Sequence, residues 1–120
     1  MPIRTGLKEK RKAKLEQELK RIIPILIKLG AEKIILFGSL AKGNVHKSSD
    51  FDLFIVMNTD KDFMERLDEV YKACKPRVAV DFFVYTPKET EDGLVSPVLL
   101  KEIQKHGRVI YEKKRTKTTN

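Results

Sequence analysis

Apolar positions recur along this chain at two different spacings, which predict helices in some segments and strands in others. Near the N-terminus the spacing is three to four residues, as on one face of a helix. The residues on this face are Leu15, Leu19, Ile22, Leu26 and Leu29. The spacing predicts a helix over residues 7–29, bent near Pro24, which lacks a backbone donor, and ended by Gly30.

Shorter apolar runs predict strands over residues 33–37, 51–57 and 77–85, and a short last strand over residues 109–111. A second helix follows Thr59 or Asp60 as cap and stops at Pro76, and a third starts at Ser96-Pro97 and ends at Gly107. Residues 39–42 are expected to form a short helical turn and residues 44–49 a polar loop. Strands that alternate with helices predict an α/β-type single sheet, although the pattern does not give the strand directions.

The composition narrows the class of protein. A chain of 120 residues, 41% hydrophobic and 35% charged, fits one soluble domain. It has no apolar run near the ~20 residues of a membrane span, and its basic start lacks the apolar core of a secretory signal. The single cysteine, Cys74, excludes an internal disulfide and a cysteine-based zinc site, and we expect it in the core. A reducing cytoplasm is therefore the predicted location.

The net charge of +8 is concentrated at the two ends. Residues 8–21 hold seven Lys or Arg against three Glu, and four more cations follow Tyr111. A nucleic-acid surface is one interpretation. Because no aromatic residues are interleaved with these charges, a solvated helix face with a basic tail is favoured.

Two aspartates stand where one apolar strand begins, and a third interrupts another strand. Asp50 and Asp52 are two residues apart, so in a strand they project to the same side. Asp81 lies between Val78-Ala79-Val80 and Phe82-Phe83-Val84. If its strand pairs beside that of Asp52, three carboxylates converge, and such hard oxygen ligands suit Mg²⁺ or Mn²⁺.

Gly38-Ser39 lies where the first strand is expected to give way to a helical turn. Free backbone N–H groups at such a turn favour phosphate, and glycine lets the phosphate approach the backbone. A phosphate cradle beside an acidic metal site indicates metal-assisted phosphoryl or nucleotidyl transfer. Taken separately, each feature has an ordinary explanation, as a turn, a loop-ending residue or a solvated strand face. Together they favour a functional site.

The combined motif resembles the signature of the nucleotidyltransferase superfamily related to DNA polymerase β. Gly38-Ser39 is followed by ten residues and then by Asp50-Phe51-Asp52, the spacing of its minimal nucleotidyltransferases (MNT). Asp81 matches the third acidic position, and the resemblance covers roughly residues 7–112. Many members carry arginine after the serine, where this chain has Leu40, which bears on phosphate contacts and substrate rather than on fold.

The resemblance implies a fold and roles for residues. It implies an α/β (α+β) nucleotidyltransferase domain over residues 1–112, with a central mixed sheet of about four strands flanked by helices, and a basic disordered tail over residues 113–120. Asp50, Asp52 and Asp81 would be catalytic and hold Mg²⁺ or Mn²⁺, with ATP as substrate. Gly38 and Ser39 would bind the triphosphate, and Lys42 could supply a cation nearby.

The resemblance also implies a partner. Many minimal domains are similar to antitoxins that transfer AMP from ATP to a tyrosine of a HEPN-domain toxin. Two alternatives stay open. One is a non-catalytic antitoxin that neutralises its partner by contact, and the other is a nucleotidyltransferase acting on a small molecule or RNA.

Overall fold

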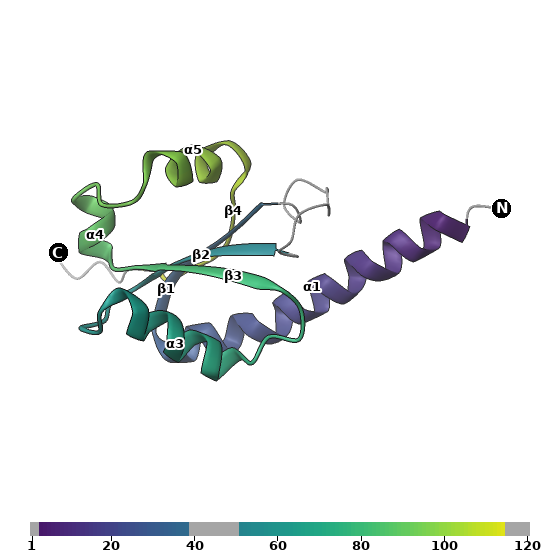
Figure 1. Ribbon diagram of the computed structural model, residues 1–120, viewed down its shortest axis with the longest axis horizontal. Coiled ribbons are helices and arrows are strands. Elements are labelled where there is room, and N and C mark those ends of the chain that lie inside the picture. The colour runs from purple at the N-terminus through teal and green to yellow at the C-terminus, as the bar shows by residue number, and fades with distance from the viewer. Residues whose placement is uncertain (1–2, 39–50, 115–120) are drawn as a thin grey trace.

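Four strands form one mixed sheet with helices on both faces (Figure 1). The computed structural model describes the backbone of residues 3–38 and 51–114, and the side chains of residues 9–38 and 51–114. The elements in chain order are α1 (Ile3–Leu29), β1 (Ala31–Phe37), β2 (Phe51–Met57), α3 (Phe63–Cys74), β3 (Val80–Tyr85), α4 (Pro87–Glu91), α5 (Pro97–His106) and β4 (Arg108–Glu112). This architecture confirms the predicted fold class.

The strand order β3-β2-β1-β4 brings three strand ends together at one end of the sheet. Strand β1 pairs antiparallel with both β2 and β4, whereas β2 and β3 are parallel. The C-terminal end of β1 therefore lies beside the N-terminal end of β2, at the same end of the sheet as the N-terminal end of β3. We call this end of the sheet the carboxylate end, because Asp52 and Asp81 lie on it.

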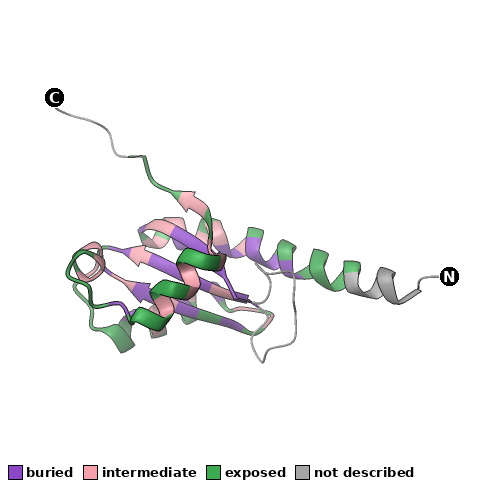
Figure 2. Cartoon of the chain, turned by 90° about the horizontal axis from the view of Figure 1, so that it is seen from above, coloured by how far each residue is buried: buried purple, intermediate pink, exposed green. Residues whose placement is uncertain are grey.

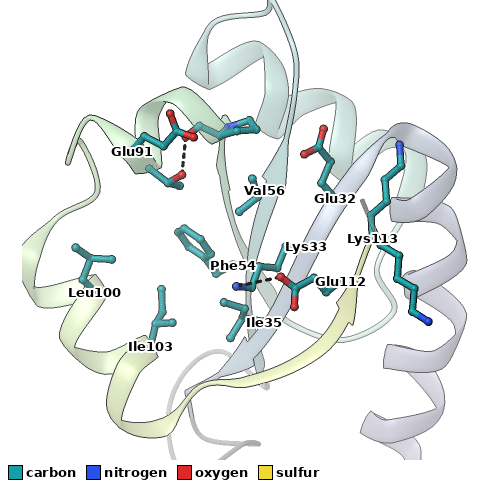
Figure 3. A pocket seen from close by; sticks show the side chains of 13 residues that line it. Glu32, Lys33, Ile35, Phe54, Val56, Glu91, Leu100, Ile103, Glu112 and Lys113 are labelled. Atoms are coloured by element: carbon teal, nitrogen blue, oxygen red, sulfur yellow. Dashed lines mark hydrogen bonds and ion pairs between the residues drawn. The ribbon is translucent and has the colours of Figure 1, made fainter. Parts of the chain in front are cut away.

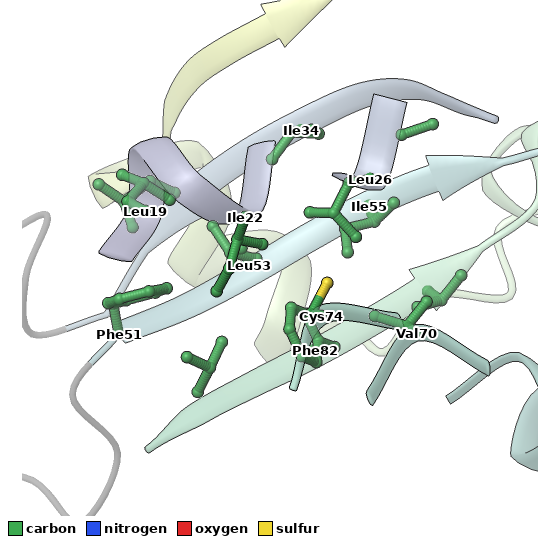
Figure 4. Packing of buried hydrophobic residues seen from close by; sticks show 14 of the residues in the cluster. Leu19, Ile22, Leu26, Ile34, Phe51, Leu53, Ile55, Val70, Cys74 and Phe82 are labelled. Carbon is green, nitrogen blue, oxygen red and sulfur yellow. The ribbon is translucent and has the colours of Figure 1, made fainter. Parts of the chain in front are cut away.

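The main core lies between the sheet and helices α1 and α3, which cover the same face (Figures 1 and 4). The largest fully buried side chains of this core are Phe51, Leu15, Ile22, Leu26, Ile34, Leu36, Leu53, Ile55, Val70 and Val84. Each such residue contributes about 1.5–3 kcal/mol of transfer free energy. Cys74 is also fully buried here, which confirms the prediction of a core thiol. Burial raises its pKa to about 11.

The opposite face carries a smaller cluster under α4 and α5. Ile35, Phe37, Phe54 and Val95 are buried in it, and Leu99 and Ile103 of α5 pack against it. No residue of α5 is fully buried, so this layer is thinner than the main core.

Helix α1 extends past the carboxylate end of the sheet (Figures 1 and 2). Among the described side chains of residues 9–29, the first that is buried is Leu15, and residues 9–14 are all exposed. The exposed residues include Lys10, Lys12 and Lys14. Residues 3–14 are called the arm below. Pro24 is exposed within the helix, which continues to Leu29.

Buried ionic contacts join elements that are distant in sequence. The carboxylate of Glu18 in α1 accepts two hydrogen bonds from Arg21, at 2.8 and 2.7 Å, and one from the backbone N–H of Arg77, at 2.6 Å. The Arg21 hydrogen bond is the main reason that the pKa of Glu18 is lowered to about 2. A second such contact joins α3 to α4, where buried Arg66 donates to both carboxylate oxygens of Glu89.

Several predicted boundaries were wrong for identifiable reasons. Helix α3 is capped by Asp62, in a capping box with Glu65, and not by Thr59 or Asp60. Strand β3 begins at Val80 and not near residue 77, because the N–H of Arg77 donates to Glu18 instead of to a strand. Helix α4 was not predicted, although Thr86 and Glu89 form a second capping box.

The other boundaries shifted by a few residues, so that α1 begins at Ile3, β1 at Ala31 and β4 spans Arg108–Glu112. The predicted turn over residues 39–42 and the predicted loop over residues 44–49 lie outside the described residues. Within residues 3–38 and 51–114, no helix combines the length and hydrophobicity that a membrane span requires.

Candidate functional site

Three of the predicted site residues come together at the carboxylate end of the sheet. Gly38 directly follows β1, and Asp52 and Asp81 are each the second residue of their strands. In the strand register, Asp52 is paired with Phe37 on one side and with Asp81 on the other. Backbones of neighbouring strands are about 4.8 Å apart, so the two carboxylates stand side by side.

The two carboxylates also lie on the same face of the sheet. Phe51 and Leu53 are fully buried in the core under α1 and α3, so Asp52 between them projects to the opposite face. The same alternation holds in β3, where Val80 and Phe82 belong to that core and Asp81 lies between them. Asp52 is half-buried and Asp81 is exposed. One cation placed over this face could contact both carboxylates.

Gly38 is required by the position of Asp52. Its φ of +81° belongs to the left-handed region that favours glycine. A Cβ atom at this position would overlap Oδ2 of Asp52 and would lie 2.9 Å from its Cγ and 3.3 Å from its Cβ. The Asp52 carboxylate therefore packs directly against the Gly38 backbone, and the absence of a side chain there makes room for it.

The remaining predicted site residues, Ser39, Lys42 and Asp50, lie outside the described residues, as does His46. Within the described part of the chain, no group of three His, Cys, Asp or Glu side chains is arranged to hold a metal ion. The pair formed by Asp52 and Asp81 supplies two oxygen ligands of the kind that Mg²⁺ and Mn²⁺ prefer. Asp50 stays the predicted third.

Tyr71 of α3, whose place on the apolar face of the helix predicts a packing residue, is a neighbour of this site. Its ring does pack, edge to face, on Phe82, with the ring centroids 4.8 Å apart. Its hydroxyl also donates a 2.7 Å hydrogen bond to the carbonyl of Val80. Partial burial, reinforced by the negative charges of Asp81 and then Asp52, raises the pKa of the Tyr71 phenol. The apolar spacing of α3 gave no sign of this hydrogen bond.

A cavity of about 680 Å³ lies elsewhere, between the sheet, α4, α5 and β4 (Figure 3). Its apolar floor includes Ile35, Phe54 and Val56, and its rim includes the ion pair between Lys33 and Glu112, whose charged atoms are 3.7 Å apart. Since Lys33 lies near the start of β1 and Val56 near the end of β2, this cavity is at the opposite end of the sheet from Asp52 and Asp81. It is therefore not the predicted site.

Comparisons with known proteins agree with this architecture. The family model described as polymerase beta, nucleotidyltransferase matches residues 20–116. Among solved structures, the chain is similar to a candidate nucleotidyltransferase from Sulfolobus solfataricus, with 19% identity and a TM-score of 0.62, over 88% of this chain and 86% of that one. No curated protein matches.

Two further similar structures are of toxin–antitoxin proteins. One is described as the toxin–antitoxin MntA-HpeT, with 20% identity and a TM-score of 0.55, over 79% of this chain and 72% of that one. The other is described as a toxin–antitoxin with AMP-PNP, with 22% identity and a TM-score of 0.54, over 79% and 73%. At these identities the structures establish a shared fold.

Proposed function

Because the chain belongs to the polymerase β nucleotidyltransferase family, we propose that it is a Mg²⁺-dependent nucleotidyltransferase that moves AMP from ATP to a hydroxyl group. The observation that carries this proposal is the pairing of Asp52 with Asp81 across two parallel strands. The Asp52 carboxylate of this pair packs directly against the Gly38 backbone. Two carboxylates this close repel each other, and a divalent cation with its bound nucleotide removes the repulsion.

In the proposed mechanism, Asp50, Asp52 and Asp81 hold the metal, which when bound neutralises charge on the nucleotide phosphates. Gly38 and Ser39 bind the triphosphate through backbone N–H groups and the serine hydroxyl, and Lys42 adds a positive charge. Asp81 orients the acceptor hydroxyl and accepts its proton. The acceptor oxygen then bonds to the α-phosphorus as the bond to the bridging oxygen breaks, so pyrophosphate leaves.

We propose further that the acceptor is a tyrosine of a HEPN-type toxin and that the protein acts as its antitoxin in the cytoplasm. The motif that the chain shares with minimal nucleotidyltransferases supports this. Its likeness in fold to chains solved in toxin–antitoxin structures, one of them with AMP-PNP, is in keeping with it.

Labelled nucleotides test the activity and the acceptor together. ATP, GTP, CTP and UTP, each labelled at the α-phosphate, are incubated in turn with Mg²⁺, the purified protein and the product of the neighbouring gene, then resolved on a denaturing gel. We expect label on the neighbour from ATP, and its loss with Asp52→Asn. Asp68→Asn, which removes an exposed carboxylate on α3, is the matched control. If Asp52→Asn transferred label as fast as the wild type, the mechanism would be wrong.

Neutralisation by contact alone is the first competing function, and the same variants separate it from catalysis. If a variant carrying both Asp50→Asn and Asp52→Asn still neutralises the toxin, while no nucleotide yields label, the protein is a binding module. The pairing of the two described carboxylates argues against this outcome, since a binding module has no need to keep them together.

Transfer to RNA is a second candidate that one observation favours. The exposed cations of the arm project from the carboxylate end of the sheet, and the chain carries a net charge of +8 (Figure 1). An RNA acceptor would be labelled in place of the protein partner, and its binding would weaken steeply with salt. Purification with nuclease that removes no bound RNA would count against it.

A further inference from the structure

Asp81 has less structural support than Asp52. Strand β3 lies at the edge of the sheet and pairs with β2 alone among the described strands, whereas β2 is paired on both sides. Asp81 is exposed and is the second residue of its strand. The N–H of Phe51 reaches the carbonyl of Ala79 at 3.4 Å, near the limit of a hydrogen bond. A metal ligand in this position needs support from another element.

Tyr71 contacts both residues that flank Asp81. Its hydroxyl donates to the Val80 carbonyl at 2.7 Å, and its ring meets that of Phe82 at an interplanar angle of 74°. Val80 and Phe82 face α3, and Asp81 between them faces the other side of the sheet. One side chain thus holds the backbone before the aspartate and the ring of the residue after it, and it does not lie between the aspartate and a ligand.

Helix α3 provides a firm base for Tyr71. Its neighbours Val70 and Cys74 are fully buried in the main core. The helix end is held by Arg21 of α1, whose Nη2 donates to the carbonyls of Cys74 at 2.9 Å and Lys75 at 3.2 Å. The backbone that carries Tyr71 is therefore held by the core, and the side chain, which is 38% exposed, extends from it to β3.

We propose that Tyr71 is a positioning residue that holds the Asp81 carboxylate where it can bind a divalent cation together with Asp52. This inference rests on the proposed function, because it takes Asp81 as a metal ligand. Tyr71 acts through the backbone of Val80 and the ring of Phe82, and its hydroxyl is already engaged by a carbonyl. It is not a catalytic residue.

The positioning role of Tyr71 can be tested without any transfer reaction. Electron paramagnetic resonance measures how tightly Mn²⁺ binds in the presence of AMP-PNP. Tyr71→Phe removes the hydroxyl and keeps the ring. We expect Mn²⁺ to bind roughly 3- to 10-fold more weakly, the effect of losing one backbone-anchoring hydrogen bond. Hydrogen exchange of the amides at the start of β3 in the metal-free protein is expected to rise.

The matched control is Tyr85→Phe, which removes the same hydroxyl four residues beyond Asp81 on the same strand. Tyr85 stacks on Phe54 with ring centroids 5.5 Å apart, away from the carboxylate end, so we expect unchanged Mn²⁺ affinity. Placing 4-aminophenylalanine at position 71 restores a donor on the same ring and is expected to restore binding. If Tyr71→Phe melts too early to titrate, the 4-aminophenylalanine variant and the exchange measurement still test the proposal.

The outcomes distinguish this inference from the proposed function. If Asp81→Asn binds Mn²⁺ as tightly as the wild type, the metal assignment fails and the role of Tyr71 fails with it. If Asp81→Asn weakens binding but Tyr71→Phe does not, only the role of Tyr71 is wrong. The positioning role of Tyr71 is also overturned if Tyr85→Phe weakens Mn²⁺ binding as much as Tyr71→Phe does. It is overturned as well if 4-aminophenylalanine at position 71 does not restore Mn²⁺ binding.

Discussion

Substitution of Gly38 by alanine tests the packing at the centre of the site. The change has two costs in the structure. The first is the backbone, because a φ of +81° is disfavoured for any residue with a Cβ atom by about 1–2 kcal/mol. The second is the new methyl group, which would overlap Oδ2 of Asp52 and lie 2.9 Å from its Cγ. The carboxylate has to rotate away from its preferred position, at a further ~0.5–1.5 kcal/mol.

Gly93 offers a control that separates the two costs. Its φ of +73° is close to that of Gly38, but nothing lies within 4 Å of a Cβ built on it. Gly93→Ala should therefore lose about 1–2 kcal/mol of unfolding free energy, from the backbone alone. We expect Gly38→Ala to lose about 1 kcal/mol more than that, the difference being the contact with Asp52.

The functional effect should be larger than the difference in stability. A displacement of about 1 Å in a catalytic group can lower a rate roughly 100-fold. We therefore expect Gly38→Ala to lose AMP transfer and Mn²⁺ affinity much as Asp52→Asn does, while Gly93→Ala keeps both. Urea denaturation gives the stability, and the labelling and Mn²⁺ experiments give the function. If the two alanine variants lose equal stability and Gly38→Ala still binds Mn²⁺ normally, the contact does not position Asp52.

Three further predictions concern the scaffold. The pKa of Glu18 is lowered from 4.5 to about 2, so its ion pair is fully present above pH 4.5 and is lost as the pH falls toward 2. The shift corresponds to at most ~3.4 kcal/mol, and because Arg21 is partly exposed we expect the wild type to lose about 2 kcal/mol more than Glu18→Gln over that range in acid denaturation. If the wild type and Glu18→Gln lost equal unfolding free energy over that range, the pKa of Glu18 would not be lowered as described. Burial raises the pKa of Cys74 to about 11, so at pH 8 a disulfide reagent should modify the native thiol over ~100-fold more slowly than in urea. Comparable rates would mean that the thiol is accessible. Arg66→Ala leaves Glu89 without its partner and should cost about 3 kcal/mol in urea, against ~0.5 kcal/mol for Lys72→Ala in an exposed pair. If Arg66→Ala and Lys72→Ala cost similar unfolding free energy, the ion pair of Arg66 with Glu89 does not hold α4 in place.

The sequence predicted those features that depend on local spacing. Strand β2 was predicted with its observed bounds, because its apolar run is flanked by polar residues on both sides. Helix α3 was recognised from its apolar face, and Ser96-Pro97 marked the start of α5. The cap of α3 was placed too early, because Thr59, Asp60 and Asp62 are all capping residues and only the reciprocal contact with Glu65 distinguishes Asp62.

Features that depend on tertiary contacts were not predictable in this way. Nothing in residues 77–79 indicates that the N–H of Arg77 donates to Glu18, a residue 59 positions earlier in the chain. For this reason the predicted strand began three residues before the observed start of β3 at Val80. Gly38 was interpreted only as a residue that lets phosphate approach the backbone. Its contact with the Asp52 carboxylate depends on the register between β1 and β2, which the sequence does not encode locally.

The position of Asp81 beside Asp52 depends on the topology of the sheet and not on local spacing alone. The alternation of a strand predicts that Asp50 and Asp52 project to one side, whatever the rest of the fold does. Asp81 joins Asp52 only if β3 lies parallel to β2 and in one particular register, since a shift by one residue would turn its side chain to the other face. Helix α3 makes the parallel pairing possible, because parallel strands need a crossover connection. The same helix carries Tyr71, whose hydrogen bond to Val80 fixes the start of β3 in that register. Helix α3 thus brings the Asp81 carboxylate to the site and also holds it there. A substitution at Tyr71 should therefore lower the metal affinity more than it lowers the stability of the fold.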